Sequence, residues 1–265
     1  MREHRSTTRS LPRFFALLVV VSLPFWLAGA APAALVPRVP LIDLPLSALV
    51  AFAPMIAALI LVSREEGTDG AKRFLRRAFE HRGIREKRWY LPILCLMPAI
   101  LLVEYGVMKV MDPTLPGPQA SPLLLAFFAI FFVTAIGEEL GWTGYATDPL
   151  LARRPALTTG LLLGAVWALW HTVTFVQTTN SLTWVFWQSL TTVGLRVLIV
   201  WLYANTGRSV FAAVMFHTVV NVSEFTYPVY GSHYDPFIAT ILIAIVVAIV
   251  TFLWGAQTLA RYRYA

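Results

Sequence analysis

The chain has 265 residues, of which 58% are hydrophobic, and it carries a formal net charge of +7 and a mean hydropathy of +0.68. This composition excludes an ordinary soluble domain, because the apolar runs are long enough to span a bilayer. The basic residues argue against a nucleic-acid partner, since 18 of the 21 flank the apolar runs instead of forming one patch. They lie in segments 2–13, 64–88, 153–154, 208 and 261–263, which the positive-inside rule places in the cytoplasm.

The apolar runs predict an all-α polytopic membrane protein. Hydrocarbon admits only helices or closed barrels as spanning structures, and these runs are too long for barrel strands. We expect a bundle of about eight transmembrane helices, at 14–31, 46–62, 91–111, 122–147, 156–176, 182–204, 210–222 and 236–253. With both termini in the cytoplasm, every basic cluster then lies on the cytoplasmic side.

Two segments leave alternatives open. The basic start, the apolar run and the small residues at 28–33 also describe a cleaved signal peptide, although the length of the run favours a retained helix. Residues 63–90 hold nine basic and five acidic residues with apolar residues between them. This pattern favours an amphipathic helix on the cytoplasmic surface, and the alternative is a charged, solvated loop.

Two adjacent carboxylates, Glu138 and Glu139, end the uncharged apolar run 123–136. Each ionisable group in hydrocarbon costs roughly 2.5–3.5 kcal/mol on insertion scales, so such groups are rarely idle. Successive helical residues point about 100° apart, so the two carboxylates need not share a role. Trp142 lies one turn beyond Glu138 on the same face. The alternative is a pair of glutamates that reach the interface without function.

Later apolar runs contain two histidines, each with a partner one turn away on the same face: Trp167 with His171, and His217 with Asn221. Structural hydrogen bonding between helices is the alternative role for both pairs. At about 1.5 Å of rise per residue, His171 lies about 22 Å from the cytoplasmic end of its span, against about 14 Å for Glu138 and 11 Å for His217. Helix tilt, or a later start of the span that holds His171, would be needed to align them.

Together, Glu-Glu at 138–139 with Gly-Trp-x-Gly-Tyr at 141–145, an aromatic-x-x-x-His at 167–171 and His-x-x-x-Asn at 217–221 resemble the CAAX-processing and bacteriocin-processing (CPBP) intramembrane protease family. This family includes proteins similar to CAAX prenyl protease 2 and Abi proteins. The resemblance covers about 121–222, including the segment 201–209. We therefore expect a protease core at 121–222, an N-terminal three-span region at 1–120 and a last helix with a basic tail at 223–265.

The resemblance implies a role for each matching residue. Glu138 would activate the attacking water, Glu139 would support it, and His171 is the histidine of the second motif. His217 and Asn221 would be either metal ligands or donors to the oxyanion. The first motif often has Arg at the position of Thr143, and the second usually has Phe at that of Trp167. Arg196, within the sixth span, is a hypothetical substitute for the missing charge, or else a structural partner of Glu104 or Glu139.

The chemistry expected is hydrolysis of peptide bonds in lipid-anchored, membrane-embedded or amphipathic substrates. We expect the protein to contact membrane lipids at a cell membrane, the plasma membrane of a bacterium. A zinc ion held by Glu138, His171 and His217 is an open alternative, although His-Glu-x-x-His is absent from the chain. We lean against an obligatory metal. The rival functions are a non-catalytic self-immunity or scaffold protein, which the Thr143 departure favours, and a proton-coupled transporter.

Overall fold

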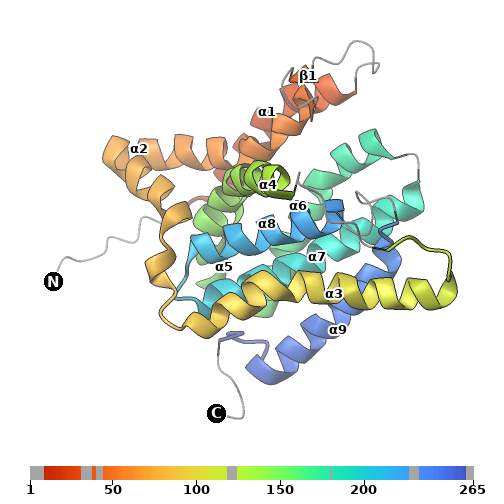
Figure 1. Ribbon diagram of the computed structural model, residues 1–265. Helices are drawn as coiled ribbons and strands as arrows, with labels where there is room; N and C mark the ends of the chain where they lie inside the picture. The colour runs from red at the N-terminus through yellow and green to blue at the C-terminus, as the bar shows by residue number, and fades with distance from the viewer. Residues whose placement is uncertain are drawn as a thin grey trace.

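The computed structural model describes residues 9–30, 38–39, 44–117, 124–179, 181–226 and 233–260. These residues form a helical bundle with one short antiparallel pair, in which Arg38 lies opposite Pro45. In chain order the α-helices and strands are α1 (Leu11–Gly29), β1 (Arg38–Val39), β2 (Leu44–Pro45), α2 (Ala53–Arg76), α3 (Tyr90–Met111), α4 (Leu124–Glu139), α5 (Asp148–Leu151), α6 (Ala156–Thr178), α7 (Leu182–Asn205), α8 (Val210–Thr226) and α9 (Pro236–Trp254) (Figure 1). Shorter helical segments are η2 (Leu46–Phe52), η3 (Arg77–Phe79), η4 (His81–Gly83), η5 (Lys87–Trp89) and the π-helix η6 (Leu140–Thr147).

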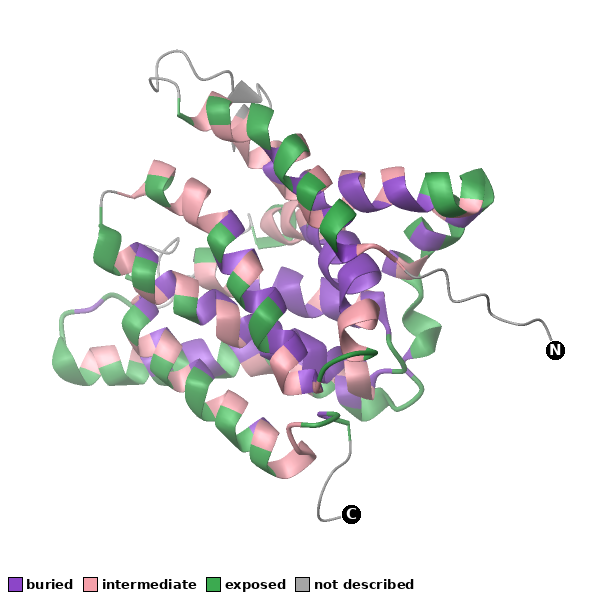
Figure 2. Cartoon of the chain, turned by 180° about the vertical axis from the view of Figure 1, so that it is seen from behind, coloured by how far each residue is buried: buried purple, intermediate pink, exposed green. Residues whose placement is uncertain are grey.

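The described residues contain seven helices that are long and apolar enough to cross a membrane. The shorter apolar helix α8 corresponds to the short seventh span expected from the sequence. Large apolar side chains are exposed along α1, α3 and α9, where Figure 2 also shows much exposed surface. Such outward-facing apolar residues are typical of helices that face lipid, so the chain is a multi-pass membrane protein built on a helical bundle.

The central helix is α7, which packs against α6, α8 and α9. Most of its residues from Thr191 to Tyr203 are buried. Glycines allow α6 to approach it closely: a Cβ at Gly160 or Gly164 would lie 2.9 Å from the Cα atom of Val197 or Val193. Small residues permit such packing between membrane helices. Because Arg196 lies in the middle of α7, its charge is enclosed by protein on all sides.

The second span departs from its expected end at residue 62. The helix α2 continues to Arg76, with a bend at Gly67, whose φ of 71° is unfavourable for residues that have a Cβ. The charged part after the bend buries Phe74 and Ala78 while its charged residues are largely exposed, so the helical alternative is the one observed over this part. Its apolar face packs on the protein, since Phe74 lies against Gly144.

The first helix is an integrated part of the described bundle. Ser22 accepts a 2.8 Å hydrogen bond from the indole of Trp170, and Phe14 stacks on Tyr145 with ring centroids 5.2 Å apart. Both contacts join α1 to the segments that carry the candidate site. Retention of the first span and the cytoplasmic position of the termini stay predictions.

Candidate active site in the membrane helices

The two adjacent carboxylates are the last residues of α4, directly before the π-helix η6. All eight residues of η6 are buried. Close approach fixes this segment on η2 and α2: a Cβ at Gly137 would lie 2.7 Å from the carbonyl oxygen of Ala51, and one at Gly141 would lie 2.6 Å from that of Pro54. Single turns of π-helix often occur at functional sites. The sequence reasoning treated the span as an ordinary α-helix to about 147 and missed this change.

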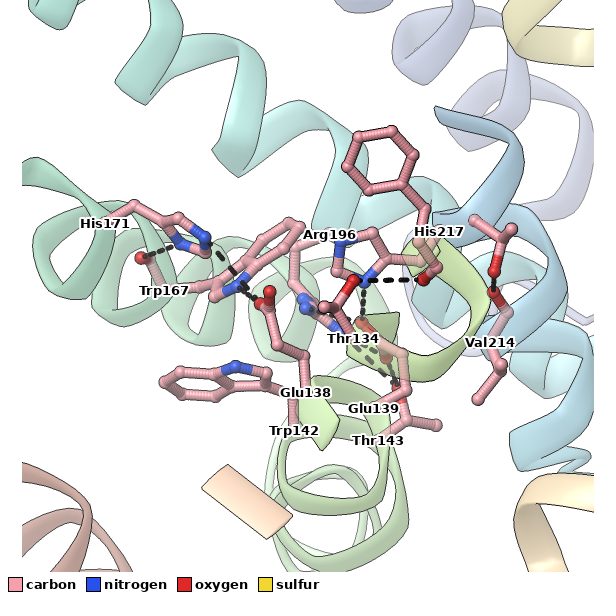
Figure 3. Close-up of polar contacts among 12 residues, drawn as sticks. Thr134, Glu138, Glu139, Trp142, Thr143, Trp167, His171, Arg196, Val214 and His217 are labelled. Carbon is pink, nitrogen blue, oxygen red and sulfur yellow. Dashed lines mark hydrogen bonds and ion pairs between the residues drawn. The ribbon is translucent and has the colours of Figure 1, made fainter. Parts of the chain in front are cut away.

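Glu138 points toward α6, where one oxygen of its carboxylate meets two side chains one turn apart (Figure 3). Oε2 accepts a 2.8 Å hydrogen bond from Trp167 Nε1 and lies 3.7 Å from His171 Nε2. The other ring nitrogen of His171, Nδ1, lies 3.1 Å from the carbonyl oxygen of Trp167. Within the described residues, Glu138 Oε1 has no hydrogen-bond partner. Only 5% of Glu138 is exposed.

Glu139 points toward α7 and α8, and both of its carboxylate oxygens accept hydrogen bonds. Its two oxygens accept hydrogen bonds of 2.8 and 3.0 Å from the guanidinium of Arg196. The hydroxyl of Thr143 donates to Oε2 at 2.5 Å, and His217 Nδ1 lies 2.9 Å from Oε1. Of the two partners weighed for Arg196 from the sequence, Glu139 is therefore the one observed. Glu104 instead accepts a 2.9 Å hydrogen bond from the backbone N–H of Asp235.

The indole of Trp167 joins the two halves of the site. The guanidinium carbon of Arg196 lies 4.0 Å from the centre of this ring, a close cation–π contact. The imidazoles of His171 and His217 each lie edge-on to it, with centroids 5.2 Å away. Trp142 is buried and makes an edge contact with Trp170 at 5.9 Å. The Trp167 side chain therefore contacts or hydrogen-bonds groups from α4, α6, α7 and α8.

Asn221 is the predicted site residue that stands apart. It lies one turn beyond His217 on α8 and is partly exposed. Its side chain forms no hydrogen bond with any residue that the structure describes. The structure thus brings together Glu138 with His171 and Glu139 with His217, while Asn221 continues the face of α8 away from them.

The three proposed metal ligands do not converge. In the described part of the chain, no group of three or more His, Cys, Asp or Glu side chains is arranged to hold a metal ion. The ring of Trp167 lies between His171 and His217, and Nδ1 of His217 is already bonded to Glu139 (Figure 3). Zinc needs its ligand atoms at about 2.0–2.2 Å from one point. The observed arrangement of Glu138 and the two histidines does not fit that requirement.

Comparison with known proteins bears on the same region. Residues 120–223 match the model of a family described as type II CAAX prenyl endopeptidase Rce1-like. The resemblance expected from the sequence is confirmed. A relative named CAAX prenyl protease 2, from Methanococcus maripaludis, is 28% identical over 188 residues, which are 65% of this chain and 68% of the relative. The Rce1-like region contains every site residue that the sequence predicted, and the family supports a membrane protease.

Sequence reasoning missed two features of this Rce1-like site. One is the π-helix, for which the glycines at 137, 141 and 144 in an otherwise apolar span were the available signal. The other is the hydrogen bond from Trp167 to Glu138, which a phenylalanine could not make. Trp167 was expected only as a mild departure from the family pattern, and here its indole donates a hydrogen bond to Glu138.

Proposed function

We propose that this chain is an intramembrane endopeptidase in which the Glu138 carboxylate activates a water molecule. The observation that carries the proposal is the asymmetric environment of Glu138. Oε2 is held by Trp167 and lies near His171, whereas Oε1 has no hydrogen-bond partner among the described side chains. A fixed carboxylate with one oxygen available is suited to take a proton from water.

The proposed reaction begins when Glu138 removes a proton from water and the hydroxide forms a bond to the carbonyl carbon of the substrate. The carbonyl electrons move to oxygen, and the resulting tetrahedral anion needs hydrogen-bond donors. His217, through Nε2–H in its imidazolium form, and the Asn221 amide are the groups we assign to this task. Collapse of the anion breaks the C–N bond, and Glu138 returns its proton to the leaving amine.

Glu139 has a different role in this proposal. It positions His217, because its Oε1 holds Nδ1 and so directs Nε2 away from the ion pair. Arg196 neutralises Glu139 and also reaches the Thr143 hydroxyl at 3.4 Å. We infer that Arg196 supplies from α7 the positive charge that the motif often carries at position 143. Because the candidate ligands do not fit a metal centre, no step is assigned to a metal ion.

The substrates that we propose are peptides with lipid-anchored, membrane-embedded or amphipathic segments. The buried position of Glu138 and the apolar surface of the surrounding helices support a substrate that enters from the membrane. The name of the relative from Methanococcus maripaludis makes prenylated peptides one candidate class. We place the protein in the cell membrane, where lipids surround the bundle.

The test compares peptide termini in membranes and medium from cells that carry wild type, Glu138→Gln, or no copy. Asp69→Asn is the matched control, since Asp69 is an exposed carboxylate on α2 that lies 3.9 Å from Lys72 and outside the site. We expect new termini with wild type and Asp69→Asn only. If Glu138→Gln produced the same termini and phenotype as wild type, the protease proposal would be wrong and a scaffold role would replace it.

A further inference from the structure

A second group of polar residues gathers where the ends of α3, α7 and α8 meet the segment that precedes α9. Glu104 is fully buried, and Glu224 lies within Coulombic range of it. The hydroxyl of Tyr234 donates to Gln188 Oε1 at 2.8 Å and lies 3.5 Å from Glu224 Oε1. Burial and the two neighbouring carboxylates raise the pKa of the Tyr234 phenol well above its usual range, so this hydroxyl remains a donor.

Neither carboxyl group in this cluster, that of Glu104 or that of Glu224, is paired with a Lys or Arg side chain in the portions that the structure describes. Lys109, on the same helix as Glu104, donates instead to the carbonyl oxygens of Pro113 and Leu115. Glu104 Oε2 is buried without a hydrogen-bond partner. This cluster therefore offers carboxyl oxygens that a hydrogen-bond donor or cation could still contact.

The group is connected to the proposed active site along one face of α8. His217, Asn221 and Glu224 are spaced by four and three residues, so their side chains lie on the same face. Glu224 also lies within Coulombic range of His217 and is partly exposed. The seven residues from His217 to Glu224 correspond to about 10.5 Å of helix, and an extended peptide covers that distance in about three residues.

We propose that Glu224 forms a subsite for a positively charged side chain of the peptide substrate, about three residues from the cleaved bond. The inference rests on the proposed peptidase function and names a feature of its substrates. Glu224 is the contact residue because it is partly exposed, whereas Glu104 is enclosed and does not reach the surface. Gln188 and Tyr234 hold the carboxylate side of the subsite in place.

The test uses palmitoylated Ala/Leu peptides in which one Lys is moved along the chain, each with a Gln counterpart. Binding is measured to purified full-length Glu138→Gln protein in detergent micelles, and cleavage by wild type is followed by mass spectrometry. We expect a Lys preference on the order of tenfold at one position, as for a partly desolvated charge pair. Adding Glu224→Gln should remove the preference, and Glu224→Lys should transfer it to a Glu peptide.

Asp112→Asn is the matched control, because Asp112 is an exposed carboxylate at the end of α3 outside this group. It should leave the Lys preference intact. The subsite would be overturned if each Lys peptide bound no better than its Gln counterpart, or if neither bound. It would also be overturned if the preference for the Lys peptide survived Glu224→Lys in correctly folded protein. Cleavage without a preference would reject the subsite alone, whereas a preference without cleavage would reject the peptidase alone.

Discussion

Removal of the Arg196 charge should destabilise the protein strongly, because it would leave Glu139 buried without a cation. Both side chains of this pair are 0% exposed, and their N–O distances are 2.8 and 3.0 Å. Breaking such a buried pair from one side typically costs about 3–5 kcal/mol. We expect Arg196→Met to lower the free energy of unfolding by this amount. The double variant Glu139→Gln with Arg196→Met should recover most of it, since no uncompensated charge remains.

The measurement is unfolding by SDS titration in mixed micelles, followed by tryptophan fluorescence. Arg208→Met provides the matched control, because its 3.3 Å contact with Asp148 is solvent-accessible, with side chains 64% and 32% exposed. That variant should lose no more than about 1 kcal/mol, as exposed ion pairs do. The reasoning would be refuted if Arg196→Met lowered the free energy of unfolding by less than about 1 kcal/mol. It would also be refuted if the double variant were no more stable than Arg196→Met alone.

Three further substitutions test other parts of the site. Trp167→Phe removes the indole donor to Glu138, the proposed base, and should lower kcat about tenfold in a folded protein, measured on the peptides that wild type cleaves. An unchanged kcat would contradict this role. Gly141→Ala would place a Cβ within 2.6 Å of the Pro54 backbone. It should lower the free energy of unfolding, measured by SDS titration, by about 1–3 kcal/mol. Gly106→Ala is the control and should cause no such loss, because its Cβ would meet no atom within 4 Å. Arg77→Ala removes a 2.7 Å hydrogen bond to the Gly144 carbonyl oxygen of the π-helix. It should lower kcat more than it raises KM, and Arg77→Lys should restore part of the loss. A change confined to KM would exclude this positioning effect.

The helical bundle could be predicted because hydropathy reports directly on burial in lipid. Seven of the expected spans correspond to helices long enough to cross, and α8 is short, as its apolar run indicated. The segment after residue 62 was harder to place. Its many charges suggested a surface location, whereas Phe74 and Ala78 also bury their side chains against the bundle. The sequence pattern predicted that this segment has an apolar face, but it could not show that this face packs on the helical bundle.

The convergence of Glu138 with His171 could be expected from their chemistry but not from their depth. Counting helical rise separated them by several ångströms, and a later start of the span with His171 was one remedy. The helix α6 begins at Ala156 as expected, so that remedy is not the explanation. Depth estimates assume helices that run parallel to the membrane normal, so a count of residues along each helix could not predict which side chains meet.

The two adjacent carboxylates have different hydrogen-bond environments because each one faces different helices. Glu138 meets an indole and an imidazole on α6, which are neutral donors or weak bases and leave its charge available. Glu139 meets a guanidinium on α7 and an imidazole on α8, which occupy both of its oxygens. A side chain with two strongly held oxygens is a poor proton acceptor, whereas one with a single held oxygen is oriented and still reactive. The 100° turn between neighbouring helical residues is thus enough to make one glutamate a candidate base and the other a structural anchor.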